Sequence, residues 1–361
     1  MSQYRKIFNE IKGKGEIISV INYEDIDCGQ WDQFISTSEN GWVTDYSEWI
    51  DFFVQKCGYQ NLSFAIKDQE KIRTAFPLFL VPNLIWGKRI VSGPFFDCGG
   101  PILLPGWHHL TTIAYRHIER LTADKGADFT EIRNPSVPIP ESISNDYYCQ
   151  FVMDLGREEK ELFKSFKNNV RRAIKKAEKA CNVKISNNPK HMDIVWEHYK
   201  LAMQRHGTPP WGNRFLAMFK KQMNLGRGHV IIAYRNDSSL GGAYLWGDGK
   251  TARLEISSAT SAEAKKLQLN SLLFWRSISL SNQLGYRKLN LTRTLKNGPQ
   301  YDFKKRWNAK ELPLPFAYIG TKVVPRDPRE TRLRHLAAMW KYLPLEMGYL
   351  FGDLIRSRMA M

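Results

Sequence analysis

The stretch that decides the fold is residues 289–318, which read LNLTRTLKNGPQYDFKKRWNAKELPLPFAY. Apolar and polar residues alternate from Leu289 to Thr292, as in a strand with one buried face, and an Asn-Gly-Pro turn at residues 297–299 ends that strand. A short helix is expected next, because several of its residues then share one side: Tyr301, Phe303, Lys304 and Trp307. The Pro-interrupted run Leu312–Tyr318 predicts an edge-like strand. A basic group framed by aromatic rings therefore lies between two predicted strands.

The lysine in this frame has two interpretations. A desolvated ammonium group can hold a phosphate or carboxyl oxygen, or stabilise an oxyanion that develops during acyl transfer. Lys304, Lys305 and Arg306 together also look like an ordinary charged helix face, and their spacing alone favours that second interpretation.

Four segments along the chain carry further motifs. They are Gly99-Gly100-Pro101, the basic run Asn168–Lys179, Arg205–Pro209, and Asn290–Thr294 followed by Tyr301–Ala309. Together they resemble the FemAB-like family of tandem GNAT-fold acyltransferases, and the resemblance covers most of the chain. The segment with Trp340, Leu343 and Pro344 is similar to the tail of the branch associated with exopolysaccharide and PEP-CTERM protein-sorting systems.

This resemblance implies an α/β fold with two tandem GNAT-like domains and mixed sheets. The domains would span residues 1–146 and 147–325, and strands and helices follow one another in both halves, with a Pro-rich linker at residues 135–140. Residues 326–361 form a basic amphipathic helical segment, which either lies on an anionic bilayer or packs onto the first domain. Single helices are expected over Glu158–Cys181 and Glu263–Leu284.

Composition sets the broad class. A chain of 361 residues with 43% hydrophobic residues suits two domains with sizeable cores. Its formal charge of +17 predicts attraction to phosphates on nucleic acid, on sugar precursors or on an anionic membrane. The polar N-terminus, the lack of a long apolar run and five cysteines without Cys-x-x-Cys pairing predict a cytoplasmic protein, peripheral on the inner face of the cell membrane, without a metal site.

The resemblance also implies where the site lies and which residues form it. In a cleft between the domains, Lys304, Phe303 and Arg293 would be catalytic, with Lys304 partly exposed and polarising the donor's ester carbonyl. Tyr301, Trp307, Arg205, Gly99, Gly100, Arg171 and Arg172 would bind substrate. Sequence alone favours a simple turn at Gly99 and Gly100. Asn290, Thr292 and Thr294 stand where family members often carry Asp, Gly and Ser, so a supporting carboxylate is missing from this strand.

The function implied is transfer of an aminoacyl or acyl group, without a cofactor, to an amine or hydroxyl of a peptidoglycan or exopolysaccharide precursor. The donor would be aminoacyl-tRNA or acyl-CoA, and the acceptor a UDP-linked or lipid-linked sugar. Residues 262–270 contain none of the glycines that receive the pyrophosphate of acetyl-CoA in GNAT enzymes, which favours aminoacyl-tRNA.

Two alternatives stay open: an acyl-CoA-dependent GNAT N-acetyltransferase, or a noncatalytic membrane-surface adaptor of a polysaccharide system. Direct binding of DNA is disfavoured, because aromatic residues are not interleaved with the basic helix.

Overall fold

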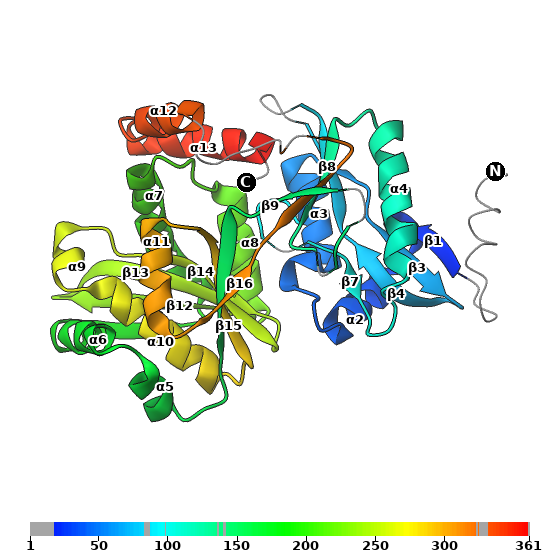
Figure 1. The fold of residues 1–361 in the computed structure, drawn as a ribbon. Coiled ribbons are helices and arrows are strands. Elements are labelled where there is room, and N and C mark those ends of the chain that lie inside the picture. The colour runs from blue at the N-terminus through cyan, green and yellow to red at the C-terminus, as the bar shows by residue number, and fades with distance from the viewer. Residues whose placement is uncertain are drawn as a thin grey trace. The chain divides into compact units, whose positions relative to one another are not determined.

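The computed structural model describes residues 18–82, 87–97, 99–135, 137–139, 142–322, 324 and 331–359. The chain forms two compact α/β units, each built on mixed β-sheet structure (Figure 1). Unit 1 comprises the chain up to Asn145 together with Pro315–Pro325, and unit 2 comprises Asp146–Leu314 and Arg326–Ser357.

Unit 1 contains a four-stranded sheet and a six-stranded sheet. The first has the order β1-β3-β4-β7, with β1 Ile18–Asn22, β3 Phe64–Asp68, β4 Lys71–Phe76 and β7 Ile102–Leu103. The second has the order β2-β5-β6-β8-β17-β9, with β2 Gln60–Asn61, β5 Leu78–Val81, β6 Arg89–Ser92, β8 Phe129–Arg133, β17 Phe316–Ile319 and β9 Ile143–Asn145. Helices α2 (Cys28–Thr37), α3 (Ser47–Cys57) and α4 (Leu110–Asp124) complete the unit.

Strand β17 corrects the expected assignment of the end of the second domain. The run Leu312–Tyr318 is not one edge strand: β16 (Lys310–Pro313) belongs to unit 2, whereas β17 pairs with β8 and β9 of unit 1. All four residues of β17 are buried, as expected for a strand with neighbours on both sides. The chain therefore returns to complete the first unit's sheet after the second unit has formed.

A buried ion network joins β6 to β8 in unit 1. The Nε atom of Arg133 lies 2.8 Å from Glu131 Oε1, and Nη1 of Arg89 lies 3.8 Å from Glu131 Oε2, with all three side chains at 0% exposure. Arg133 Nη1 also donates to the carbonyls of Gly93 and Phe96, at 3.1 and 2.9 Å. The network thus fixes the loop that precedes the Gly99-Gly100 bend.

Unit 2 is built on one seven-stranded sheet with the order β11-β12-β13-β14-β15-β10-β16. The strands are β10 Tyr148–Asp154, β11 Asn182–Ser186, β12 Gly228–Arg235, β13 Ser238–Gly247, β14 Thr251–Ser258 and β15 Lys288–Leu295, with β16 as given above. Its helices are α5 Glu159–Ser165, α6 Asn168–Ala180, α7 Met192–His206, α8 Asn213–Asn224, α9 Ala262–Lys266, α10 Leu269–Gln283 and α11 Pro299–Lys304.

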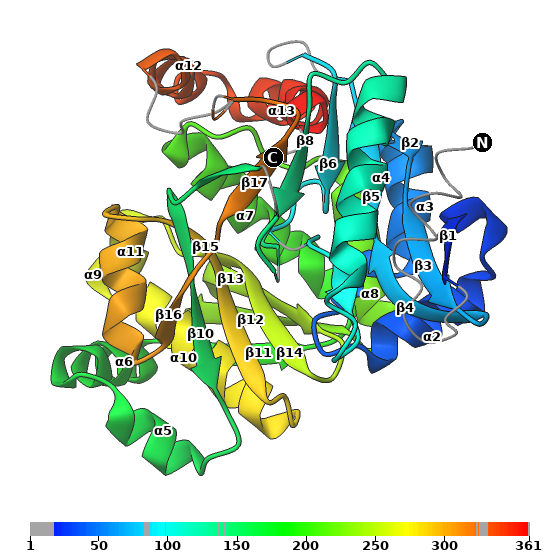
Figure 2. The ribbon, with the colours of Figure 1, turned by 45° about the vertical axis from the view of Figure 1, so that its right-hand side comes forward.

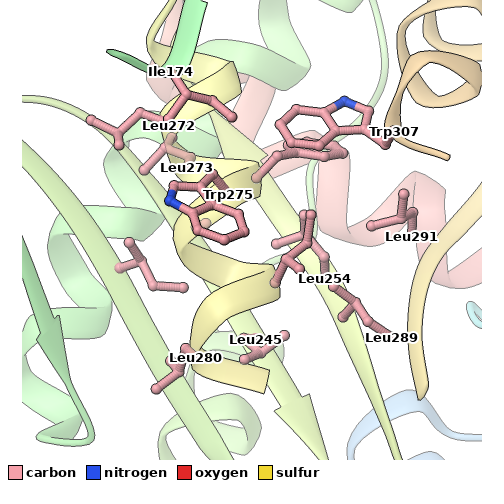
Figure 3. Packing of buried hydrophobic residues seen from close by; sticks show 14 of the residues in the cluster. Ile174, Leu245, Leu254, Leu272, Leu273, Trp275, Leu280, Leu289, Leu291 and Trp307 are labelled. Carbon is pink, nitrogen blue, oxygen red and sulfur yellow. The ribbon is translucent and has the colours of Figure 1, made fainter. Parts of the chain in front are cut away.

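Neighbouring residues of a strand in the unit 2 sheet pack against helices on opposite faces of the sheet. Ala243 and Leu245 of β13 belong to the core formed with α6 and α10, and Figure 3 shows Leu272 and Trp275 of α10 in this core. Tyr244, between them in sequence, packs against Phe219 of α8, with ring centres 5.0 Å apart. The strand's period of two therefore gives the sheet helices on both faces (Figure 2).

Two helices expected to be continuous are each broken. The expected helix Glu158–Cys181 becomes α5 and α6, because Phe166 adopts an extended backbone. Its ring turns into the core and contacts Trp275 and Trp307 at 5.7 and 5.2 Å. The expected helix Glu263–Leu284 becomes α9 and α10, separated at Gln268, which is left-handed with φ 61°.

The C-terminal segment differs from the expectation that it packs onto the first domain. Up to Ser357, helices α12 (Thr331–Trp340) and α13 (Leu345–Met359) belong to unit 2. Asp353 forms an ion pair with Arg214 of α8 at 3.0 Å, and Arg356 donates to the carbonyl of Pro209 at 2.9 Å. Gln204 of α7 donates to the carbonyl of Leu343 at 2.7 Å. These polar anchors explain why the segment docks beside α7 and α8.

Gly207 allows this docking and gives a testable expectation. It ends α7 with φ 69°, and a Cβ added there would collide with the carbonyl of Ala337 in α12. We expect Gly207→Ala to lower the free energy of unfolding by roughly 1–2 kcal/mol and to expose α12 to protease.

Gly226→Ala is the matched control for Gly207→Ala. Gly226 has a similar φ of 73°, but a Cβ there meets no atom within 4 Å. Urea unfolding and limited proteolysis should show α12 released in Gly207→Ala and retained in the control. Equal cleavage of α12 in both variants would contradict the contact.

Candidate functional site

A β-bulge in β15 shapes the region that the sequence singled out. Gln150 pairs with Arg293 and Val152 with Asn290, so one residue of β10 opposes two residues of β15. Thr292 within the bulge has φ 64°, and its N–H donates to Asn290 Oδ1 at 2.8 Å. Asn290 Nδ2 in turn donates to Gln150 Oε1 at 2.7 Å. The bulge turns the carbonyls of Thr292 and Arg293 toward Lys304, the last residue of α11.

Lys304 donates hydrogen bonds to both carbonyls. Its Nζ donates to Thr294 Oγ1 at 2.9 Å and to the carbonyls of Thr292 and Arg293 at 3.3 and 3.4 Å. The residue is 6% exposed. The expectation of a partly exposed lysine is therefore wrong. Three acceptors replace the water that burial removes, so the ammonium group holds α11 against the bulge of β15.

The aromatic residues that flank Lys304 in sequence pack into the core of unit 2. Phe303 packs edge-on against Phe274 at 4.9 Å, and the buried Trp307 stacks on Phe274 at 5.4 Å. Figure 3 shows Trp307 above the core residues of β15. On the other side of α11, the Tyr301 hydroxyl donates to Glu311 at 2.8 Å, and this hydrogen bond raises the pKa of Tyr301.

A pocket of about 340 Å³ lies beside this aromatic group. It is formed by the first turns of α6 and α10, by α9, and by the end of α11 with the residues that follow it. Its polar lining consists of Asn169, Lys265, Gln268, Asn270, Ser271 and Arg306, and its apolar lining of Val170, Ala173, Ala264, Leu269, Phe303 and Trp307. The size is in the range of small-molecule sites.

The electrostatics of this pocket favour an anion. Leu269, Asn270 and Ser271 are the first residues of α10, where the helix dipole is positive. The N–H of Ser271 already donates to the carbonyl of Gln268 at 2.9 Å. Lys265 of α9 and Arg306, which follows α11, add two cationic side chains to the lining. A phosphate ester with an apolar or aromatic end matches this combination of groups.

This protein resembles proteins of known fold. Residues 164–305, which include Lys304 and the pocket lining except Arg306 and Trp307, match the family model of an acetyltransferase (GNAT) domain. No curated protein matches the sequence. The crystal structure of FemX is similar over 83% of this chain and 97% of its own, with a TM-score of 0.64 and 14% identity.

Two further solved structures share this fold. A tandem GNAT protein from the clavulanic acid biosynthesis pathway has a TM-score of 0.51 at 10% identity, over 85% of this chain and 100% of its own. The C-terminal domain of a putative lysylphosphatidylglycerol synthetase from Agrobacterium fabrum has a TM-score of 0.54 at 10% identity, over 82% and 91%.

This chain has the tandem GNAT fold. The fold class expected from the sequence is thereby confirmed, and FemX represents the FemAB family among the similar structures. The closer likeness to the exopolysaccharide and PEP-CTERM branch stays a prediction.

Within the GNAT fold, the predicted site residues divide into groups. Phe303 and Trp307 line the pocket, and Lys304 and Tyr301 belong to the same short helical segment. Arg171 and Arg172 lie between the pocket-lining residues Val170 and Ala173 of α6 but are not part of the lining, and they are half-buried and exposed, respectively. Arg205 is exposed in the last turn of α7.

Arg293 belongs to a second polar group of the GNAT sheet. Its guanidinium lies 5.1 Å from the ring centre of Tyr148. On the neighbouring strand β14, Glu255 accepts a hydrogen bond from Trp246 Nε1 at 3.1 Å and forms an ion pair with Arg253 at 3.4 Å. Glu255 is a buried-sheet carboxylate on the strand next to β15, and sequence reasoning missed it. The alternation of Arg253, Glu255 and Ser257 with apolar neighbours could have indicated it.

Gly99 and Gly100 serve the backbone of unit 1. A Cβ on Gly99, whose φ is 146°, would lie 2.5 Å from the backbone N of Gly93, and one on Gly100 would lie 2.6 Å from the carbonyl O of Asn134. The tight turn favoured by sequence alone explains both glycines. Their role in substrate binding stays a prediction.

Proposed function

We propose that the protein is an acyltransferase that transfers an aminoacyl or acyl group to an amine or hydroxyl of a cell-envelope precursor, a peptidoglycan or exopolysaccharide intermediate. The observation that carries this proposal is the cationic pocket of unit 2, lined by the start of α10, Lys265 and Arg306. We further propose that the protein works at the inner face of the cell membrane, where lipid-linked sugars are available.

The proposed donor is an aminoacyl-tRNA, whose end carries an adenosine and a phosphodiester. The pocket offers Phe303 and Trp307 for apolar contact and Lys265 and Arg306 for the phosphate. Gln268 stands at the left-handed position before α10, in a segment without the glycines that suit a pyrophosphate. FemX, as a similar structure, supports the FemAB-like assignment through the fold.

The proposed reaction is a direct acyl transfer. The acceptor nitrogen or oxygen attacks the donor's carbonyl carbon, the donor's ester C–O bond breaks, and the proton of the acceptor passes to the leaving hydroxyl through substrate or solvent. Phe303 and Arg293 keep their predicted catalytic roles in this proposal. Lys304 acts as a positioning residue, because its Nζ is engaged by β15 and fixes the wall that carries Phe303.

Each alternative has one observation in its favour. The match of residues 164–305 to an acetyltransferase domain favours an acyl-CoA donor. The burial of Lys304 favours a noncatalytic adaptor of a polysaccharide system, because a buried lysine cannot contact a substrate directly.

Binding by variants of the pocket tests the proposal. We expect a Lys265→Gln/Arg306→Gln variant to bind a stable aminoacyl minihelix at least about tenfold more weakly, because two charge-assisted contacts to phosphate are lost. Lys266→Gln is the matched control, as Lys266 is the exposed neighbour in α9 and lies outside the pocket lining.

Titration calorimetry with the minihelix and with coenzyme A distinguishes the donors. Tight binding of coenzyme A alone would replace the aminoacyl donor with an acyl-CoA. Failure of both to bind would contradict the enzyme and favour the adaptor.

A further inference from the structure

Helix α13 packs its polar face against the protein and leaves its apolar face exposed. Polar side chains of α13 contact α7 and α8, and Gly352 lies against Pro210 of the loop between them: Tyr349 accepts from Trp196 Nε1 at 2.9 Å, and Asp353 pairs with Arg214 at 3.0 Å. Arg356 lies 4.4 Å from the ring centre of Trp211. The core-facing side of a helix is normally its apolar side.

The opposite face of α13 is apolar and exposed. Met347, Leu350, Phe351 and Leu354 are spaced at i, i+3, i+4 and i+7, and they are 47%, 73%, 45% and 56% exposed. Met339 and Tyr342, at the end of α12 and just beyond it, are 69% and 89% exposed. Together these six residues form what we call the outer stripe. An exposed apolar group of this kind marks an interaction surface.

The charges of the hairpin identify the partner. Residues 331–359 contain five basic and two acidic side chains. Both acidic groups already face cations, since Glu346 lies 4.0 Å from Lys200 and Asp353 pairs with Arg214. Lys341, next to Tyr342, is exposed. The hairpin therefore adds the exposed cationic side chains of Lys341 and Arg358 to its apolar stripe, a combination that is complementary to anionic phospholipids.

We propose that the α12–α13 hairpin is an interfacial membrane anchor, which lies in the headgroup region of an anionic bilayer with the outer stripe buried among the acyl chains. Figures 1 and 2 show the two helices lying beside each other, as a flat-lying pair requires. Among the described helices, none is long and apolar enough to cross a membrane. The inference rests on the proposed inner-membrane location and is independent of the transfer reaction.

Vesicle flotation of the full chain tests this anchor. We expect binding to phosphatidylglycerol-containing vesicles and much weaker binding to pure phosphatidylcholine. Leu350→Gln/Leu354→Gln should lower the affinity for the anionic vesicles by at least about tenfold, because transfer of each leucine contributes on the order of tenfold. Leu225→Gln/Leu284→Gln is the matched control, since these leucines of unit 2 are 51% and 44% exposed away from the hairpin.

Three results would overturn the anchor: no binding to anionic vesicles, equal loss in the control, or a wild-type dimer in solution that the Leu350→Gln/Leu354→Gln variant converts to monomer. The pocket variant Lys265→Gln/Arg306→Gln should still float with anionic vesicles. Flotation and donor binding thus separate failure of the anchor from failure of the proposed transferase.

Discussion

Replacing Lys304 with alanine is expected to lower the free energy of unfolding by roughly 2–4 kcal/mol. The substitution removes a side chain that is 6% exposed and leaves the Thr292 and Arg293 carbonyls and Thr294 Oγ1 without its three donors. Helix α11 then loses its attachment to β15, so donor binding should fall as well. Chemical denaturation of the purified protein measures the first effect.

Lys305→Ala is the control for this prediction. Lys305 is the next residue, exposed, with Nζ 5.4 Å from the ring centre of Tyr301. We expect its replacement to change the stability by less than about 1 kcal/mol. A Lys304→Ala protein as stable as wild type, but without transfer activity, would restore the catalytic role that the sequence suggested.

Glu131→Gln should have the largest effect on stability, a loss of about 3–5 kcal/mol. The substitution keeps the volume but removes the carboxylate that faces Arg89 and Arg133, and all three side chains are fully buried. Arg133 also holds the carbonyls of Gly93 and Phe96, so the loop before Gly99 should open first. Urea unfolding gives the stability, and amide hydrogen exchange at residues 93–97 gives the local effect.

Glu119→Gln, in the exposed surface of α4, is the matched control for Glu131→Gln. We expect it to change stability by no more than about 0.5 kcal/mol. A loss of less than about 1 kcal/mol in Glu131→Gln would show that the network contributes little.

Local sequence patterns predicted the elements whose causes are local. The turn at Asn236 and Asp237 joins β12 to β13, and both residues have positive φ, as two-residue hairpin turns require. Helix α3 spans Ser47–Cys57 and ends at Gly58, whose left-handed backbone is a common helix C-cap.

The features that sequence reasoning missed depend on contacts distant in the chain. The apolar period continues through Phe166, so only the rings of Trp275 and Trp307 explain why the helix breaks there. Similarly, Lys304 stands in a run of three basic residues, and its burial follows from the bulge that a register shift creates against Gln150.

The C-terminal helices show the same limit. Their amphipathic pattern identifies an apolar face but does not say which face meets the protein. Polar residues such as Asp353 pair with Arg214, nearly 140 positions earlier in the chain, and this pairing turns the apolar face outward.

The most direct test of the proposed transferase is a crystal structure of the chain soaked with a stable adenosine-ended aminoacyl analogue, solved beside one with coenzyme A. We predict the ligand in the unit 2 pocket, with its phosphate within hydrogen-bond distance of Lys265 or Arg306 and near the first residues of α10. A ligand bound elsewhere, or an empty pocket at saturating concentration, would contradict the proposal.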